Sequence, residues 1–210
     1  MLHATLRSIS KTIPVLVLTS FAGTAGAATQ IGEVVEVKGE VVRVMERSTK
    51  KLGVGEPIFE KDVLQTMKDS SAKIKLMDGK ATAGAVLLKQ NSKVKIEKPK
   101  SIEINLSEGS LLSVFNRKKE EKSEPYRVKT RTAVIGVRGT TFYAQVEKGK
   151  EDYICPCQGQ VSISTKKSKE LVSGVHHDFP KFVGDDGRVK ETEVRQGHDD
   201  EEIASLKSLL

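Results

Sequence analysis

Five side chains that can bind a metal ion lie close together near the end of this 210-residue chain. Cys155 and Cys157 are its only cysteines, and three of its four histidines, His176, His177 and His198, follow within a 44-residue window. Thiolate and imidazole are the ligands that zinc prefers, and copper or iron binds similar sets. We therefore expect one metal ion, with zinc the best match, bound by both cysteines, His198 and one of the two adjacent histidines.

The Cys155-Pro156-Cys157 segment fits an extended strand, in which both sulfurs point to one face and Pro156 to the other. Proline lacks an amide donor, which favours an edge position where an ion could reach the sulfurs. A disulfide between these cysteines would be strained, because two rises of about 3.3 Å bring the Cα atoms near the upper bridging limit of roughly 6.8 Å. A thiol/disulfide redox pair and a plain structural role remain open alternatives.

Several aspartates lie near these histidines in the sequence. A carboxylate can orient a metal-binding imidazole by accepting a hydrogen bond from its outer nitrogen. Aspartates beside glycines are also common turn residues with solvated side chains. Both interpretations apply to Asp178, Asp185, Asp186, Asp199 and Asp200.

Alternating apolar and polar residues dominate the elements that must position these ligands. The alternation has a period of two, which predicts short β-strands, and glycines such as Gly39, Gly79, Gly109 and Gly159 supply turn signals between them. We therefore expect an all-β fold, either a multi-stranded sandwich or a β-coil. The expected strands are residues 31–44, as two strands around Gly39, and residues 72–77, 92–97, 101–106, 126–130, 140–146 and 160–165.

Two segments depart from this pattern. Residues 116–124 form a charged run without periodicity, which is typical of an exposed loop or hairpin tip. Near the end of the chain, acidic residues from Asp199 precede an apolar stripe that includes Ile203 and Leu206. Acids in the first turn followed by this spacing predict a short C-terminal helix that packs on the sheet.

The N-terminus has the order of a secretory signal peptide. Arg7 and Lys11 precede an apolar run over residues 13–21, and Ala25 and Ala27 fit a cleavage pattern. The run is shorter than the roughly 20 residues that span a bilayer. We expect cleavage after Ala27, a periplasmic or secreted product without a transmembrane segment, and a net charge reduced from +7 to +5 by the loss of two basic residues.

The order of several landmarks resembles the FecR domain family. The most distinctive is Thr132-Ala-Val-Ile-Gly-Val-Arg-Gly-Thr-Thr-Phe, preceded by Leu52-Gly-Val-Gly-Glu-Pro-Ile and Ser71-Ala-Lys-Ile-Lys-Leu-Met-Asp-Gly and followed by Gln158-Gly-Gln-Val-Ser-Ile. The resemblance implies a FecR-like β domain over residues 28–165. Residues 166–210 then form a Cys/His-associated extension that ends in the helix.

Within this signature, Gly136 and Gly139 bracket a short connection that carries Arg138 and is followed by Thr140. The glycines permit sharp turns or a close approach of the backbone. We expect Arg138 to pair mainly with carbonyl or carboxylate oxygens of the fold, because the guanidinium group suits such fixed pairings.

Motifs for catalysis are missing from the sequence: it has no G-x-S-x-G elbow, no H-E-x-x-H helix and no phosphate-binding loop before a helix. The charges are mixed along the chain and tryptophan is absent, which disfavours nucleic-acid binding. We therefore expect a non-enzymatic module of the cell envelope. It would either bind an envelope protein or polymer or sense a metal or redox state, and the sequence leaves its oligomeric state open.

Overall fold

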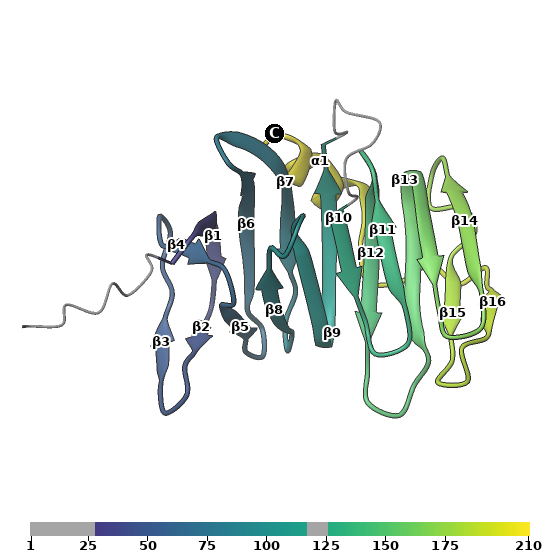
Figure 1. Ribbon diagram of the computed structural model, residues 1–210, viewed down its shortest axis with the longest axis horizontal. Coiled ribbons are helices and arrows are strands. Elements are labelled where there is room, and N and C mark those ends of the chain that lie inside the picture. The colour runs from purple at the N-terminus through teal and green to yellow at the C-terminus, as the bar shows by residue number, and fades with distance from the viewer. Residues whose placement is uncertain (1–27, 117–125) are drawn as a thin grey trace, which may run out of the picture.

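A computed structural model describes residues 28–116 and 126–210. The expected signal peptide and residues 117–125, which include all of the charged run except Asn116, lie outside the described residues. The fold is all-β with a single short helix among the described residues, as the sequence predicts. Figure 1 shows the strands side by side along the longest axis, from β3 and β4 at one end to β14–β16 at the other.

The strands form two sheets that face each other. Sheet I contains, in spatial order, β4 (Pro57–Phe59), β1 (Gln30–Lys38), β6 (Ser71–Asp78), β7 (Ala81–Leu88), β9 (Glu103–Phe115), β12 (Thr141–Val146), β13 (Asp152–Ser164), β15 (Lys181–Val183) and β16 (Val189–Glu191). Sheet II contains β3 (Thr49–Lys51), β2 (Val41–Val44), β5 (Val63–Thr66), β8 (Lys93–Glu97), β9, β10 (Tyr126–Lys129), β11 (Val134–Val137), β13 and β14 (Lys169–Gly174). Among the described strands, every pairing is antiparallel except β9 with β10.

Two long strands, β9 and β13, run from one sheet into the other. Each bends at a glycine in the left-handed region, Gly109 with φ 82° and Gly159 with φ 92°. The prediction that these glycines mark turns between strands was therefore wrong. They form corners within strands, where a residue with a Cβ atom would be strained.

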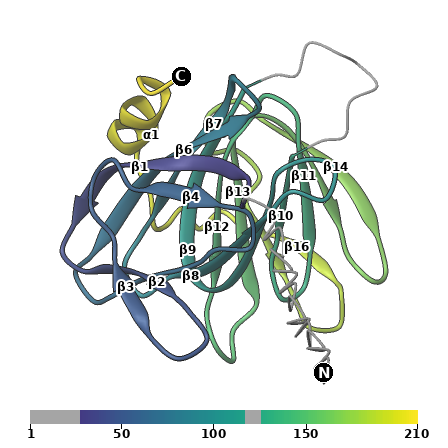
Figure 2. The same ribbon diagram turned by 60° about the vertical axis from the view of Figure 1, so that its left-hand side comes forward.

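The main core lies between the two sheets and consists of the inward-facing apolar residues of both. A second apolar cluster covers the outer face of sheet I. It joins Leu87, Leu112 and Tyr143 of the sheet to Ile203 and Leu206 of α1 (Asp200–Lys207). Figure 2 shows α1 lying against the outside of the sheet that holds β6 and β7.

The helix begins at a capping box. Asp199 accepts a hydrogen bond from the Glu202 backbone at 2.8 Å, and the Glu202 side chain accepts one from the Asp199 backbone. Ile203 and Leu206 are buried against sheet I, as their spacing predicts. A helix of eight residues is marginal alone, so its stability comes from this packing and from the chain that leads into it.

The FecR-type signature lies around β11. Gly136 is in the middle of β11 between β10 and β13, and Gly139 has φ 69°. Thr140 is buried and its hydroxyl donates to the Gln160 carbonyl at 2.8 Å. Arg138 is exposed. The pairing expected for its guanidinium group stays a prediction.

Candidate metal centre

The two cysteines lie on β13, on the outer face of sheet I. Cys155 pairs in register with Tyr143 of β12, and both sulfurs face the second apolar cluster while Pro156 points to the opposite side, as alternation predicts. Pro156 lies at a break in the pairing on one side of β13, as its missing amide donor predicts. The expected access of an ion to the sulfurs was wrong, because Cys155 is fully buried and Cys157 is 3% exposed. The pairing of β13 with β15 ends at Ile154. Beyond it, the backbone of Gly174 packs against Pro156 so closely that a Cβ atom on residue 174 would lie 2.0 Å from the Pro156 carbonyl oxygen.

His177 comes from the connection between β14 and β15. Its backbone N–H donates to the Cys157 carbonyl at 3.2 Å, which anchors the connection to β13. Its φ of 56° is in the left-handed region, an unusual conformation for a histidine that its surroundings must hold in place. The Nδ1 atom lies 3.9 Å from the Cys155 sulfur.

His198 comes from the segment that leads into α1. Its Nε2 atom lies 3.1 Å from the Cys157 sulfur, and its ring stacks on Tyr143 with centroids 4.5 Å apart and planes at 14°. The ligand atoms of Cys155, Cys157, His177 and His198 all lie within 4.8 Å of one another. Metal–sulfur bonds of about 2.3 Å and metal–nitrogen bonds of about 2.05 Å in a tetrahedron separate ligand atoms by roughly 3.3–3.8 Å. The separations of 2.8, 3.1 and 3.9 Å among these atoms lie on both sides of that range, so the cluster is close to the size of a tetrahedral site.

The outer ring nitrogens show which way the two imidazoles are turned. His198 Nδ1 lies 2.9 Å from the Gln196 carbonyl oxygen, and His177 Nε2 lies 3.0 Å from Asp200 Oδ1. A carbonyl or carboxylate oxygen can only accept, so each outer nitrogen carries hydrogen. In the neutral rings, the inner nitrogens then face each other as bare lone pairs at 2.8 Å. A metal ion bound to both nitrogens, or a proton on His177 that makes the contact a hydrogen bond, relieves that repulsion. Outer acceptors of this kind are usual for metal-binding histidines.

The electrostatics of the pair favour one thiolate. The hydrogen bond from Cys157 holds the pKa of Cys155 well below its usual range. Burial opposes this shift, and both histidines add to it. The same bond and burial raise the pKa of Cys157. Burial disfavours a charge on His177, but hydrogen bonds to Asp200 and Cys155 outweigh it and raise the pKa of His177. The site thus offers a preformed soft anion to a metal ion.

The expected ligands do not all meet at one point. The structure brings together both cysteines, His177 and His198, whereas His176 points outward and pairs with Asp200 at 3.2 Å. Of the aspartates considered, Asp200 orients His177 and Asp199 caps the helix. The others form turn or surface contacts: Asp178 with the His176 backbone, Asp185 with Arg131 and Asp186 with Arg188.

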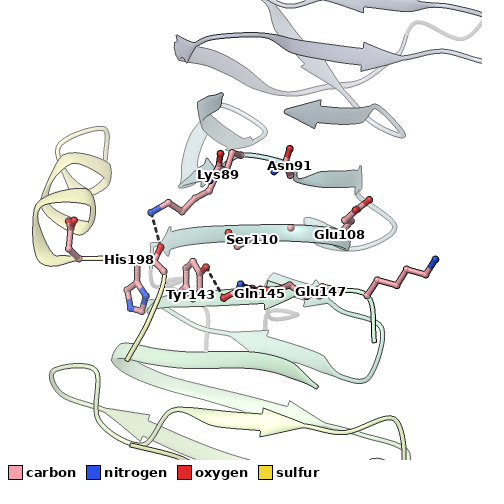
Figure 3. Close-up of a pocket in the computed structure, with 14 residues that line it drawn as sticks. Lys89, Asn91, Glu108, Ser110, Tyr143, Gln145, Glu147 and His198 are labelled. Carbon is pink, nitrogen blue, oxygen red and sulfur yellow. Dashed lines mark hydrogen bonds between the residues drawn. The ribbon is translucent and has the colours of Figure 1, made fainter. Parts of the chain in front are cut away.

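Sequence reasoning missed Tyr143 and Gln196, which position His198, and Lys89, which binds the tail. Lys89 Nζ donates to the Gly197 carbonyl at 2.7 Å and to Glu202 at 2.5 Å. Lys89 and Tyr143 border a polar cavity of about 690 Å³ beside His198 (Figure 3). Because Tyr143, Gln196 and Lys89 come from three separate segments, no local motif could have indicated them.

The β-sheets and the cysteines of the candidate site lie in a part of the chain that matches a known domain family. Residues 62–162 match the family described as FecR protein, and the chain contains a FecR domain. The match includes Cys155 and Cys157, whereas His177 and His198 lie beyond it. The candidate ligand set therefore combines two residues of the matched domain with two residues that follow it.

One solved structure supports the same fold. A crystal structure described as a "putative anti-sigma factor" from Parabacteroides distasonis ATCC 8503 aligns with a TM-score of 0.52 at 16% identity, covering 68% of this chain and 63% of that one. A second structure with the same description gives a TM-score of 0.44 at 16% identity, over 64% and 63%. The chain thus spans less than two thirds of the length of these structures. No curated protein matches the chain, and no helix within residues 28–116 and 126–210 is long and apolar enough to cross a membrane.

Proposed function

We propose that this protein is an exported, non-enzymatic FecR-domain module of the cell envelope in which one metal ion fastens the C-terminal tail to the β domain. Export rests on the N-terminal pattern of Arg7, Lys11, the apolar run and Ala25 and Ala27. The signalling class rests on the FecR match. In this proposal the mature protein lies in the periplasm or outside the cell, and its partner is an envelope protein or polymer.

The observation that carries the metal site is the arrangement of the two imidazoles. Their inner nitrogens approach to 2.8 Å beside two sulfurs, while Asp200 and Gln196 hold the outer nitrogens. Zinc fits best because the four ligands are two thiols and two imidazoles in a buried cluster of tetrahedral size. Copper or iron is the alternative for the same donor atoms.

The ion would act on the tail rather than on a substrate. His198 immediately precedes the capping residue Asp199, so a bond to its nitrogen fixes the start of α1. Without the ion, the tail keeps the packing of Ile203 and Leu206 and the contacts of Lys89. Metal binding is therefore expected to stabilise a docked tail that loosens when the ion is removed.

A thiol/disulfide redox function is the second candidate, because Cys155 and Cys157 are both free and adjacent on one face of β13. It differs in what it requires of the histidines. A redox pair needs no bond from His198, whereas the metal site does.

Elemental analysis with free-thiol titration distinguishes the two candidates, using protein purified from an oxidising compartment without added metal. The proposal predicts about one metal ion per chain, lost in Cys155→Ser and in His198→Ala. Gln158→Ala is the control, because it removes a tail contact to Lys207 at 2.5 Å but no ligand. Absence of metal in the wild type, with thiols that titrate only after reduction, would favour the redox function instead.

A further inference from the structure

His177 presents its two ring nitrogens to two different groups of ligands. Nδ1 faces the buried sulfurs, whereas Nε2 lies 3.0 Å from Asp200 Oδ1, and His176 Nε2 lies 3.2 Å from Asp200 Oδ2. Ligand atoms of His176, His177 and Asp200 lie within 4.8 Å of one another. Two imidazoles and a carboxylate form a donor set suited to zinc, copper or nickel.

The two groups differ in how solvent reaches them. The side chains of His176 and Asp200 are 66% and 67% exposed, whereas that of His177 is 9% exposed. The sulfurs beneath are closed off by the sheet, the connection that carries His177 and the tail. On the side where the connection after β14 meets the tail, an ion arriving from solvent therefore meets His176 and Asp200 before it can reach a thiol.

The outer group is held in place by contacts of its own. The His176 backbone N–H donates to Asp178 Oδ2 at 3.3 Å, and Asp178 lies 3.8 Å from Arg195 of the tail. Asp200 is the first residue of α1, where the helix dipole favours a negative charge. The outer group thus lies where the connection after β14 meets the tail.

We propose that His176, Asp200 and the Nε2 atom of His177 form an outer site that first captures a divalent transition-metal ion and then passes it to the buried Cys155–Cys157–His177–His198 site. This inference rests on the metal site proposed above and adds the route by which that site is filled. Asp200 has two roles in turn, as a ligand of the outer ion and as the acceptor that orients His177 once the ion is inside.

The transfer balances without any redox change. With the ion on Nε2, the neutral ring of His177 carries its proton on Nδ1. When the ion moves to Nδ1, the proton resides on Nε2, where Asp200 accepts the hydrogen bond, and thiol protons displaced by the ion leave to solvent. One neutral ring binds through one nitrogen at a time, so the outer ion leaves as the inner one becomes bound.

Loading kinetics test the route in the full chain. Metal-free wild type and His176→Ala are mixed with zinc in a stopped-flow instrument, and zinc uptake is followed with a competing fluorescent chelator. We expect uptake at least tenfold slower in His176→Ala, with the same amount of zinc bound at saturation. Equal uptake rates would overturn the proposal. His176 is the residue to change because Asp200 also orients the inner site.

A second measurement separates failure of this inference from failure of the buried site. Cys155→Ser/Cys157→Ser removes the thiolates, and Cu²⁺ binding to this variant is measured by electron paramagnetic resonance with and without His176→Ala. We expect weak Cu²⁺ binding whose spectrum changes, with at least a tenfold loss of affinity, when His176 is removed. Binding and spectra that do not depend on His176 would refute the outer site, whatever the buried site contains.

Discussion

Replacing Leu206 by alanine tests whether packing holds α1 on sheet I. Leu206 is fully buried in the second apolar cluster. Truncating a buried leucine costs about 2–5 kcal/mol, and we expect about 2–3 kcal/mol here because a short helix at the surface can shift to fill part of the space. At about 1.4 kcal/mol per factor of ten, this cost corresponds to roughly 30- to 150-fold more frequent opening of the helix.

Hydrogen exchange by mass spectrometry measures that opening directly. Exchange should rise in peptides covering residues 200–208 and stay unchanged in peptides of β2 and β5, because these strands belong to sheet II and contribute nothing to the second apolar cluster that holds α1. Leu210→Ala is the control, since Leu210 is 42% exposed and its loss should change stability by less than about 0.5 kcal/mol. Exchange in Leu206→Ala that equals the control would refute docking by this residue.

Three further predictions concern the β domain, and urea unfolding tests each. Gly109→Ala should lower the free energy of unfolding by at least about 3 kcal/mol, because a Cβ atom there would lie 2.4 Å from the Asn91 oxygen at φ 82°. The control Gly79→Ala has open space at φ 66° and should lower it by about 1–2 kcal/mol. Similar losses in the two variants would show that the corner in β9 is not tightly packed. Thr140→Val should lower the free energy of unfolding by about 1–2 kcal/mol, because it removes the hydroxyl that donates to the buried Gln160 carbonyl. The control Thr49→Val changes an exposed residue and should lower it by no more than about 0.5 kcal/mol. Equal effects would contradict the buried hydrogen bond. Burial, with a smaller contribution from Asp78, raises the pKa of Tyr126 to about 12. The unfolded phenol ionises near pH 10, so the stability that this shift contributes is complete below pH 10 and is lost as the pH rises towards 12. Tyr126→Phe should therefore lose less stability than the wild type over that pH range.

Alternation predicted eight of the sixteen described strands, in whole or in part, where apolar and polar residues alternate along the chain. β6 and β8 show the expected pattern of buried and half-buried residues. β7 escaped prediction, since its residues Ala83–Leu88 are buried on both faces, between the main core and α1, and a strand without a polar face has no period to read. The corners at Gly109 and Gly159 escaped for another reason, because a glycine bend inside a strand has the same local signal as a turn between strands.

The ligand types of the candidate site were visible in the sequence, but their selection was not. Local spacing placed both sulfurs on one face of β13, since alternation is a property of any strand. The choice of His177 over His176 depends on the backbone bond to Cys157 and on the positive φ of His177. Tyr143 and Gln196 act through tertiary contacts with His198, which only the path of the tail across sheet I creates.

X-ray absorption at the zinc edge tests the central claim most directly, on protein purified with one zinc ion per chain. The site predicts two sulfur neighbours at about 2.3 Å and two nitrogen neighbours at about 2.0–2.1 Å. In His198→Ala one nitrogen should be lost or replaced by a solvent oxygen, with both sulfurs kept. A shell of nitrogen and oxygen alone, without sulfur, would contradict a metal ion that joins β13 to the C-terminal tail.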